Sequence, residues 1–283
     1  MKENSGVLYI VSTPIGNLED ITLRAVRVLS EVDIIACEDT RHSIKLLNHL
    51  DIKKPLISYH DNNRIMRAHQ LIEKLREGND IALISDAGTP LISDPGEELV
   101  SMAVENGIKV TVIPGCTASI AALTLSGLPT GRFVFEGFLP QKRTDRIKHL
   151  ENIQYEDRTI IFYEGPHRLK AMLKDVLEVL GDRKCAVVRE LTKIHEEVVR
   201  GTVSQALSHF ETHNPRGEFV IVIEGSKNKA PSEEKSELTE LSVEEHVNYY
   251  INQGQSRMQA MKSAAKDRGI TKREVYAILN TDK

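Results

Sequence analysis

Short apolar stretches recur through the first part of the chain, separated by polar or amphipathic segments. Each stretch is four or five residues long and rich in valine and isoleucine. This pattern is typical of strands that are buried on both faces of a sheet. We predict strands at residues 7–11, 33–37, 55–58, 81–85 and 109–113.

Helical periodicity fills the segments between these strands. Apolar residues at three- and four-residue spacing predict a helix over residues 21–32 with Asp20 as its N-cap, and another around residues 71–75. Pro95 is expected to open a third helix, which Gly107 ends. The alternation of strand and helix predicts an α/β fold with a mostly parallel sheet that helices cover on both faces.

The same alternation starts again after a segment rich in glycine and proline at residues 127–131. Strands are predicted at residues 133–138, 159–163, 184–188 and 219–223, with an antiparallel strand at 197–202. Helices are predicted at residues 143–153, 167–180 and 204–210. We therefore expect two α/β domains, an N-terminal one over residues 1–127 and a second over residues 128–225.

The chain changes character after residue 225. Residues 226–245 hold six glutamates, three lysines and no aromatic residue, which predicts a flexible acidic linker, placed at residues 226–240. Helical periodicity returns at residues 243–251, and two further helical patterns, 257–266 and 272–279, flank Gly269 with helix-turn-helix spacing. A small helical unit is expected at residues 241–283.

Composition limits the class of protein. Hydrophobic residues make up 40% of the 283 positions and charged residues 28%, as in an ordinary globular chain. The net charge of −4 excludes a strongly basic nucleic-acid-binding protein. The cysteines Cys37, Cys116 and Cys185 lie far apart, so neither a disulfide framework nor a structural zinc site is expected. Because no apolar run is long enough for a membrane span or a signal peptide, we expect a cytoplasmic protein.

Several familiar cofactor and catalytic motifs are absent from the sequence, namely GxGxxG, GxxxxGK[ST], HExxH and GxSxG. Instead, polar loops follow predicted strands at residues 12–17, 38–41, 85–90, 114–119 and 163–168. Glycine and proline in any one loop could serve only to turn the chain. Together the loops favour a ligand site, because open α/β sheets bind ligands at the carboxyl ends of their strands.

Five motifs resemble those of one known family. They are ISDAGTPLISDPG (84–96), STPIGNLEDIT (12–22), EDTR (38–41), FVFEGFLP (133–140) and YEGPHR (163–168). Over residues 6–225 the chain resembles the tetrapyrrole-methylase superfamily, and within it the branch that acts on ribosomal RNA. The resemblance implies two α/β domains of the class III methyltransferase type, S-adenosylmethionine bound between them, a homodimer and no metal.

For this branch, the resemblance implies 2′-O-methylation of a cytidine ribose in small-subunit (16S) ribosomal RNA, in the decoding region. The implied partner is that RNA within the assembled 30S particle, with no role for DNA or a membrane. Two other hypotheses stay open. A tetrapyrrole (precorrin or uroporphyrinogen) C-methyltransferase suits the net negative charge, and a ligand-sensing DNA-binding regulator would use residues 257–280.

The resemblance also assigns residues to the methyl donor. They are Pro14, Ile15, Gly88, Thr89, Pro90, Ile92, Thr117, Ala118 and Tyr163. A ribose hydroxyl needs help to lose its proton, so polar residues at strand ends are candidates for catalysis. These candidates are Asp39, Arg41, Glu164 and His167, with Glu38 beside them. Simpler interpretations are a helix N-cap for Asp39, a solvated charge for Arg41 and a first-turn helix residue for His167.

Two basic segments offset the negative charge locally. Residues 142–148 carry four basic residues against one acidic residue, and residues 254–283 carry seven against three. Such patches would suffice on a large RNA, although a solvated helix face is the usual explanation. Most aromatic residues of the second domain, such as Phe133, Phe135, Phe162 and Phe219, fall in predicted strands. We expect them in the core, so the sequence indicates no stacking platform.

Overall fold

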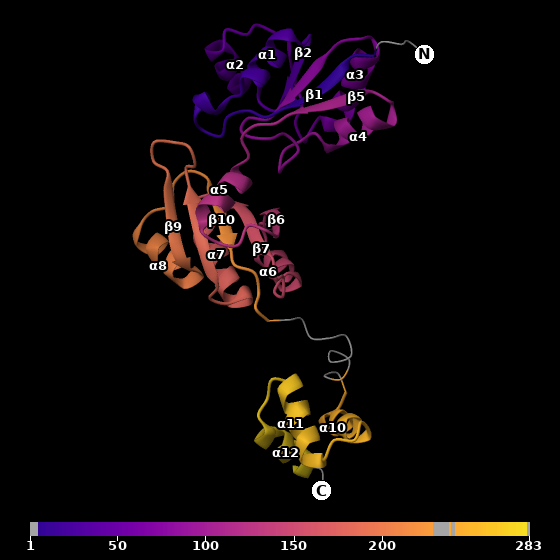
Figure 1. Cartoon of the computed structure of the whole chain (residues 1–283), viewed down its shortest axis with the longest axis vertical. Helices are drawn as coiled ribbons and strands as arrows, with labels where there is room; N and C mark the ends of the chain where they lie inside the picture. The colour runs from indigo at the N-terminus through magenta and orange to yellow at the C-terminus, as the bar shows by residue number, and fades with distance from the viewer. Residues whose placement is uncertain (1–4, 229–237, 239–240, 282–283) are drawn as a thin grey trace. The chain divides into compact units, whose positions relative to one another are not determined.

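In the computed structural model the chain forms two compact units, Met1–Lys227 and Asn228–Lys283. Figure 1 traces the elements of each unit. The structure describes residues 5–228, residue 238 and residues 241–281, so most of the predicted linker at 226–240 lies outside the described residues. Within those ranges, no helix is both long and apolar enough to cross a membrane.

The first sheet has five parallel strands in the order β3-β2-β4-β1-β5. They are β1 (Val7–Val11), β2 (Ile34–Cys37), β3 (Leu56–Ser58), β4 (Ile81–Ile84) and β5 (Lys109–Ile113). All five predicted strands are confirmed, with ends that move by at most one residue. The last residue of β1, Val11, pairs with Ile84 and Ile113, so the loops that follow these three strands begin at one edge of the sheet.

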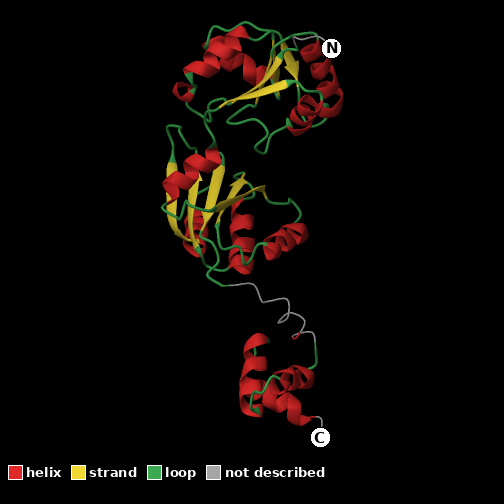
Figure 2. Cartoon of the chain, turned by 45° about the vertical axis from the view of Figure 1, so that its right-hand side comes forward, coloured by secondary structure: helices red, strands yellow, loops and turns green. Residues whose placement is uncertain are grey.

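Helices cover both faces of this sheet, as Figure 2 shows. They are α1 (Leu23–Glu31), α2 (Thr40–His49), α3 (Arg64–Arg76) and α4 (Glu97–Glu105). Successive residues of a strand point to opposite faces, so Ile35 packs with Leu29 of α1, whereas Ile34 packs with Leu71 of α3. The predicted α/β layering is thereby confirmed.

Three predicted helix starts lie two residues before the observed ones, those of α1, of α4 and, in the second domain, of α7 (Leu169–Leu180). Asp20 lies in a short 3-10 helix, η1 (Leu18–Asp20), and the N-cap of α1 is Thr22, whose hydroxyl accepts a hydrogen bond from the Ala25 N–H at 3.0 Å. Helix α4 begins after Gly96 and not at Pro95. Gly96 has a φ of 148°, a conformation that side-chain-bearing residues rarely adopt, so glycine makes the turn into the helix.

The second sheet is mixed, in the order β6-β7-β10-β8-β9. Its strands are β6 (Phe133–Phe138), β7 (Thr159–Glu164), β8 (Lys184–Arg189), β9 (Glu197–Thr202) and β10 (Phe219–Ile223). β6 and β7 are parallel, whereas β10 is antiparallel to both β7 and β8, and β9 is antiparallel to β8 as predicted. The pairing of β6 with β7 shifts register between Phe135 and Gly137.

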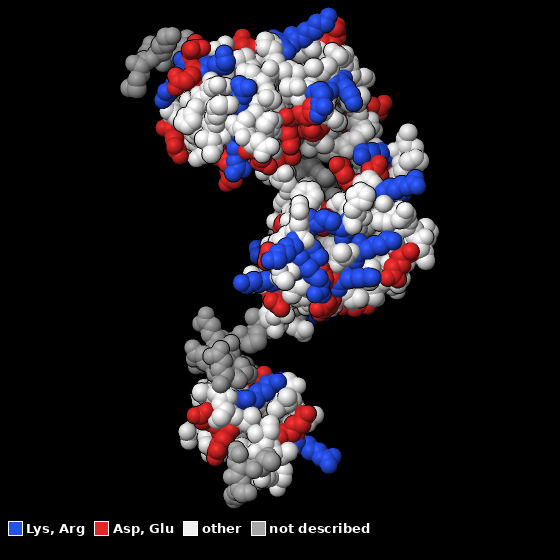
Figure 3. Space-filling model, turned by 180° about the vertical axis from the view of Figure 1, so that it is seen from behind, with Lys and Arg blue, Asp and Glu red and all other residues white. Residues whose placement is uncertain are grey.

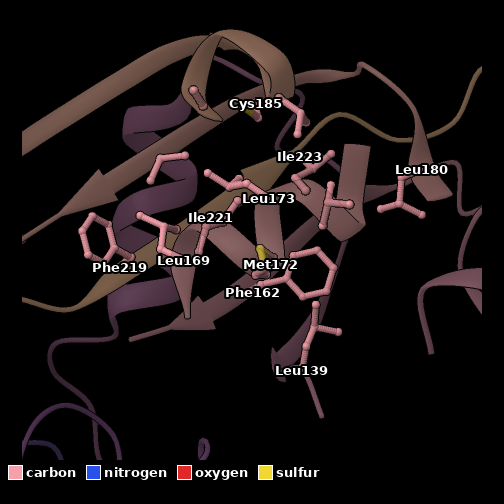
Figure 4. Packing of buried hydrophobic residues seen from close by; sticks show 14 of the residues in the cluster. Leu139, Phe162, Leu169, Met172, Leu173, Leu180, Cys185, Phe219, Ile221 and Ile223 are labelled. Carbon is pink, nitrogen blue, oxygen red and sulfur yellow. The ribbon is translucent and has the colours of Figure 1, made fainter. Parts of the chain in front are cut away.

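Four helices flank the second sheet, namely α5 (Ala118–Ser126), α6 (Arg143–Asn152), α7 (Leu169–Leu180) and α8 (Val203–Thr212). Helices α6 to α8 share one core, and Figure 4 shows Phe162 and Ile221 of the sheet packed with Met172 of α7. Helix α5 covers the other face, where Leu123 joins a core with Val220. Although α5 follows the first sheet in sequence, it therefore packs on the second. The predicted boundary between residues 127 and 128 stays a prediction.

The unit Asn228–Lys283 contains α10 (Val243–Asn252), α11 (Arg257–Asp267) and α12 (Lys272–Thr281). All three helices contribute to its core, which includes Val247, Met261 and Val275. Gly269, with a φ of 65°, makes the predicted turn between α11 and α12. Its neighbour Arg268 turns inward and lies 3.0 Å from Nδ1 of the buried His246. The exposed cations of these helices are Arg257, Lys262, Lys266, Lys272 and Arg273.

Candidate functional site

A cavity of about 360 Å³ lies where loops that follow strands of the first sheet meet strand ends of the second, a size that suits a small organic ligand. The first-sheet loops contribute Ile15, Asp86, Ala87, Gly88, Thr89, Ile92, Ser93 and Asp94, and the start of α5 contributes Thr117 and Ala118. The second domain contributes Phe138, Tyr163, Glu164, Gly165, Val188, Glu190, Leu191, Lys193, Glu218, Phe219 and Val220. Four of the five motifs singled out in the sequence thus meet around one cavity, whereas EDTR (38–41) contributes no residue to its lining.

Thr89 joins three loops at the wall of this cavity. Its hydroxyl donates to the carbonyl oxygen of Cys116 at 3.0 Å. The Thr89 hydroxyl oxygen also lies 3.0 Å from Oγ of Ser12 and 2.8 Å from Oγ1 of Thr117. Since the Thr89 hydroxyl has a single proton, the other two hydroxyls can donate to it. The loops after β1, β4 and β5 are therefore fixed before a ligand arrives.

Gly88 lets two backbone segments and a side chain meet closely. The Thr13 N–H donates to the Gly88 carbonyl at 2.8 Å, and the Gly88 N–H donates back to the Thr13 carbonyl at 3.1 Å. Gly88 has a φ of 88°, and a β-carbon added there would lie 3.2 Å from Cγ2 of Ile15. The position requires glycine both for its backbone conformation and for space.

Aromatic rings form the opposite wall. Tyr163 packs edge-to-face with Phe135 and Phe138, with ring centroids 4.9 and 5.6 Å apart. The Tyr163 hydroxyl accepts a hydrogen bond from the backbone N–H of Ser119 at 3.0 Å, which ties β7 to the first turn of α5. Phe138 is 56% exposed although it lines the cavity. A ligand would therefore meet a rigid aromatic surface on this side.

The cavity is lined by more negative than positive groups. Its carboxyl groups belong to Asp86, Asp94, Glu164, Glu190 and Glu218, and the ammonium group of Lys193 lies 3.0 Å from Glu190. Such a lining favours a cationic ligand and repels phosphate groups. In the described part of the chain, no group of three or more histidine, cysteine, aspartate or glutamate side chains is placed to hold a metal ion.

Asp94 was not among the residues predicted to act in catalysis. Burial raises the pKa of its carboxyl group to about 7, and the nearby carboxyl groups of Glu38 and Asp86 add to this effect. A carboxyl group with a pKa near neutrality is an effective proton acceptor. The only sequence signal was that acidic residues follow both β2 and β4, neighbouring strands of one sheet.

Glu164, a predicted catalytic residue, lines the cavity and is only 2% exposed. Its Oε1 accepts a hydrogen bond from the Gly165 N–H at 2.9 Å, and its Oε2 lies 3.2 Å from Nη2 of Arg168. Burial raises the pKa of the Glu164 carboxyl group, and the positive charge of Arg168 opposes this rise. Among the described residues, Oε2 has this ion pair but no aligned hydrogen bond, so it can accept one from a ligand.

The other three predicted catalytic residues do not line the cavity. Asp39 is the N-cap of α2, and its carboxylate also accepts two hydrogen bonds from the Arg41 guanidinium, at 2.8 and 3.1 Å. These bonds lower the pKa of Asp39 to about 2, which makes it a weak proton acceptor. His167 is exposed in the turn before α7. The catalytic roles of Asp39, Arg41 and His167 stay predictions.

Most of the residues assigned to the methyl donor come together. Those that line the cavity are Ile15, Gly88, Thr89, Ile92, Thr117, Ala118 and Tyr163. The remaining two, Pro14 and Pro90, are buried in the same loops but do not line it. Proline fixes φ near −65°, so these two residues limit the backbone conformations of the loops without contacting the cavity. Donor binding by the nine residues stays a prediction.

Lysine and arginine side chains gather on one face of the second α/β domain, as Figure 3 shows. Two of the cations in the predicted basic segment 142–148 are nevertheless neutralised. Arg146 is 6% exposed and lies 2.7 Å from Asp175, while Arg143 lies 2.9 Å from Asp175 and 2.7 Å from Glu178. The number of basic residues in the sequence therefore overstates the positive charge that this segment presents to solvent. Only Lys142 and Lys148 are exposed and outside these ion pairs, so only they remain candidates for RNA contact.

Comparison with known proteins gives consistent matches. Residues 7–207 match the family described as Tetrapyrrole (Corrin/Porphyrin) Methylases. A protein of Halalkalibacterium halodurans named Ribosomal RNA small subunit methyltransferase I is 48% identical over 281 residues, which cover 99% of this chain and 97% of that protein. A protein of the same name from Thermotoga maritima is 48% identical over 222 residues, 78% of this chain and 100% of that protein.

Solved structures share the fold. The crystal structure of uroporphyrin-III C-methyl transferase from Thermus thermophilus, complexed with S-adenosyl homocysteine, has a TM-score of 0.54 and 20% sequence identity. The match covers 77% of this chain and 96% of that one. It shows that the paired α/β domains have the architecture of tetrapyrrole methylases.

Proposed function

The chain belongs to the tetrapyrrole methylase family and, within it, to the ribosomal RNA small subunit methyltransferase I proteins, and from that premise we propose that it methylates small-subunit ribosomal RNA. The donor is S-adenosylmethionine, and the acceptor is the 2′-hydroxyl of a cytidine ribose in the decoding region of 16S rRNA, within the 30S particle. The observation that carries the proposal is the carboxyl-lined cavity between the two sheets.

The lining of the cavity suits this donor. Ile15, Ala118 and Leu191 offer apolar surface for an adenine ring, and Gly88 leaves room for close approach to backbone groups. The carboxyl groups of Asp86 and Asp94 favour the positive sulfonium. When bound, S-adenosylmethionine supplies a methyl carbon that the sulfonium makes electrophilic.

The protein must then orient the ribose hydroxyl and accept its proton. We assign proton acceptance to Asp94, because burial and neighbouring carboxyl groups raise its pKa to about 7, whereas Arg168 lies 3.2 Å from Glu164 and favours its charged form. The Asp94 carboxylate takes the proton as the 2′-oxygen bonds to the methyl carbon. The electron pair of the broken carbon–sulfur bond stays on sulfur, which becomes a neutral thioether, so atoms and charges balance.

A competition between acceptors tests the proposed function. The wild-type chain is incubated with labelled S-adenosylmethionine in three parallel reactions, each with one acceptor. The acceptors are 30S particles from cells that lack this protein, free 16S rRNA and uroporphyrinogen III. We expect label in the RNA of the 30S particles. Label in uroporphyrinogen III and none in RNA would replace the proposal with tetrapyrrole C-methylation.

The functional form is proposed to be a homodimer, as the family resemblance implies. Apolar side chains on β5 and α5 are available for such a contact, since Val112, Ile120 and Leu125 are 56%, 45% and 36% exposed. Exposed apolar surface of this kind is typical of interaction sites.

Removal of residues 241–283 should leave donor binding intact and weaken binding to 30S particles by about 10-fold, because a second attached RNA contact raises the overall affinity. The excised helices have their own core, and the Thermotoga maritima relative is about as long as unit Met1–Lys227 alone. Calorimetry with the donor and a filter-binding assay with 30S particles measure the two effects. Loss of donor binding, or unfolding of the remaining unit, would contradict the prediction.

Asp39→Asn should keep the methyl-transfer rate within about threefold of wild type, because asparagine caps a helix nearly as well as aspartate. The pKa of Asp39, lowered to about 2 by its hydrogen bonds with Arg41, also makes it a weak base. Single-turnover rates provide the measurement. A loss of about 10²-fold with unchanged donor affinity, typical of lost acid–base help, would return the base to Asp39.

A further inference from the structure

The aromatic ring of Phe138 lies at the rim of the cavity and is more exposed to solvent than aromatic rings usually are. Phe138, the last residue of β6, lines the cavity and is 56% exposed. Its ring contacts Tyr163 edge-to-face and leaves much of its surface to solvent. Phe162 and Phe219, by contrast, are at most 2% exposed, as expected for core residues, whereas the same expectation is wrong for Phe133, which is 38% exposed.

The irregularity in β6 places Phe138 on this side. Side chains three residues apart in a regular strand point to opposite faces, yet Phe135 and Phe138 both contact Tyr163. The register shift before Gly137, whose φ is 60°, allows this. A β-carbon added at Gly137 would lie 3.2 Å from Oγ of Ser93, so this end of β6 lies beside the loop that carries Asp94.

The segment after Phe138 is held in place by two arginines. Arg168 donates to the carbonyl oxygens of Leu139 and Pro140 at 2.5 and 3.3 Å. Arg146 donates to the carbonyl oxygens of Pro140 and Gln141 at 3.1 and 2.9 Å. An exposed ring on an anchored backbone loses little conformational freedom when a ligand covers it.

We propose that Phe138 is the platform on which the base of the target nucleotide stacks, so that its ribose is presented to Asp94. This inference rests on the proposed function. A base is uncharged and can enter a carboxyl-lined cavity, whereas its phosphates stay outside. Aromatic rings recognise bases through their faces, since every base has a π-face.

The test compares Phe138→Ala with Phe133→Ala on 30S particles. Phe133 is a matched control at the other end of β6, 38% exposed and not part of the cavity lining. We expect Phe138→Ala to lower kcat/KM for 30S particles by about 10- to 100-fold, the range typical of a lost base–aromatic stack. Phe138→Trp should restore most of the activity. Calorimetry should show donor affinity unchanged in all three variants.

Each outcome decides between distinct conclusions. If wild type methylates the particles and Phe138→Ala behaves like Phe133→Ala, the stacking role is wrong while the proposed function stands. If Phe138→Ala loses donor affinity in parallel with activity, the ring belongs to the donor site and the inference is also wrong. If wild type transfers no methyl group to RNA, the proposed function fails first and the inference fails with it.

Discussion

Asp94→Asn should lower the single-turnover rate of methyl transfer at pH 7 by about 10²-fold or more, because the amide cannot accept the proton of the ribose hydroxyl. Donor affinity should fall much less, since asparagine keeps the size of the side chain. Asp51→Asn is the matched control. Asp51 is exposed, does not line the cavity and has a φ of 54°, which asparagine tolerates.

The pH dependence provides a second readout of Asp94. Burial and the charges of Glu38 and Asp86 raise its pKa to about 7, so the wild-type rate should rise with pH up to about 7 and then level off. The folded state binds the proton of Asp94 more tightly than the unfolded state, where the ordinary value is 3.8. Its contribution to stability is therefore present below pH 4 and is lost as the pH rises through 7.

Asp94→Asn should remove the pH dependence of the methyl-transfer rate and the contribution of this residue to the pH dependence of stability. The rate of the variant should become nearly independent of pH between 6 and 8, and its melting temperature should fall less than that of wild type between pH 5 and pH 8. Thermal unfolding at pH 5 and pH 8 measures the latter. A variant that keeps the wild-type rate and its inflection near pH 7 would contradict the assignment and favour Glu164, the carboxyl candidate from the sequence that lines the cavity.

Gly88→Val should weaken donor binding by about 10²-fold or more while the chain stays folded, because a branched side chain would occupy space that only glycine leaves open. The β-carbon alone would lie 3.2 Å from Cγ2 of Ile15 and 3.7 Å from the Cys116 carbonyl oxygen. The two hydrogen bonds between Gly88 and Thr13 keep the backbone from moving away. Calorimetry with S-adenosylmethionine measures the effect.

Backbone strain must be separated from the blocked cavity. Gly107→Val supplies the control, since Gly107 has a φ of 67° but a β-carbon there would meet no atom within 4 Å. Both variants should lose about 1–2 kcal/mol of stability from the left-handed conformation, but only Gly88→Val should lose donor affinity. Equal donor affinity in the two folded variants would show that Gly88 does not border the donor.

Local patterns predicted the first sheet well but gave no range for two helices, α2 and α5. The apolar runs of β1 and β5 have the predicted ends, since polar or turn-forming residues border each run. Helix α5 gave no amphipathic signal because its sequence, ASIAALTLS, is apolar on nearly every side. It packs on a sheet formed by strands that come later in the chain, and helix periodicity carries no information about such a partner.

The sequence predicted those site residues that lie within one recognisable motif. It did not predict the properties of the site that depend on residues distant in the sequence. Gly88 and Thr89 lie within a single recognisable motif, and both line the cavity. The raised pKa of Asp94 depends on its burial and on Glu38, which another strand brings near. Phe138 was missed because strict strand alternation does not allow for the register shift before Gly137. Burial, pairing and strand irregularity are tertiary properties that single motifs do not encode.

The most direct test of the central claim is to identify the methylated nucleoside. Wild-type protein is incubated with S-adenosylmethionine and 30S particles from cells that lack it, after which the 16S rRNA is digested and its nucleosides are resolved by mass spectrometry. We predict one additional 2′-O-methylcytidine per particle, from the decoding region, and none with Asp94→Asn at matched times. A methyl group on a base, or methylated tetrapyrrole with unmodified RNA, would contradict the account.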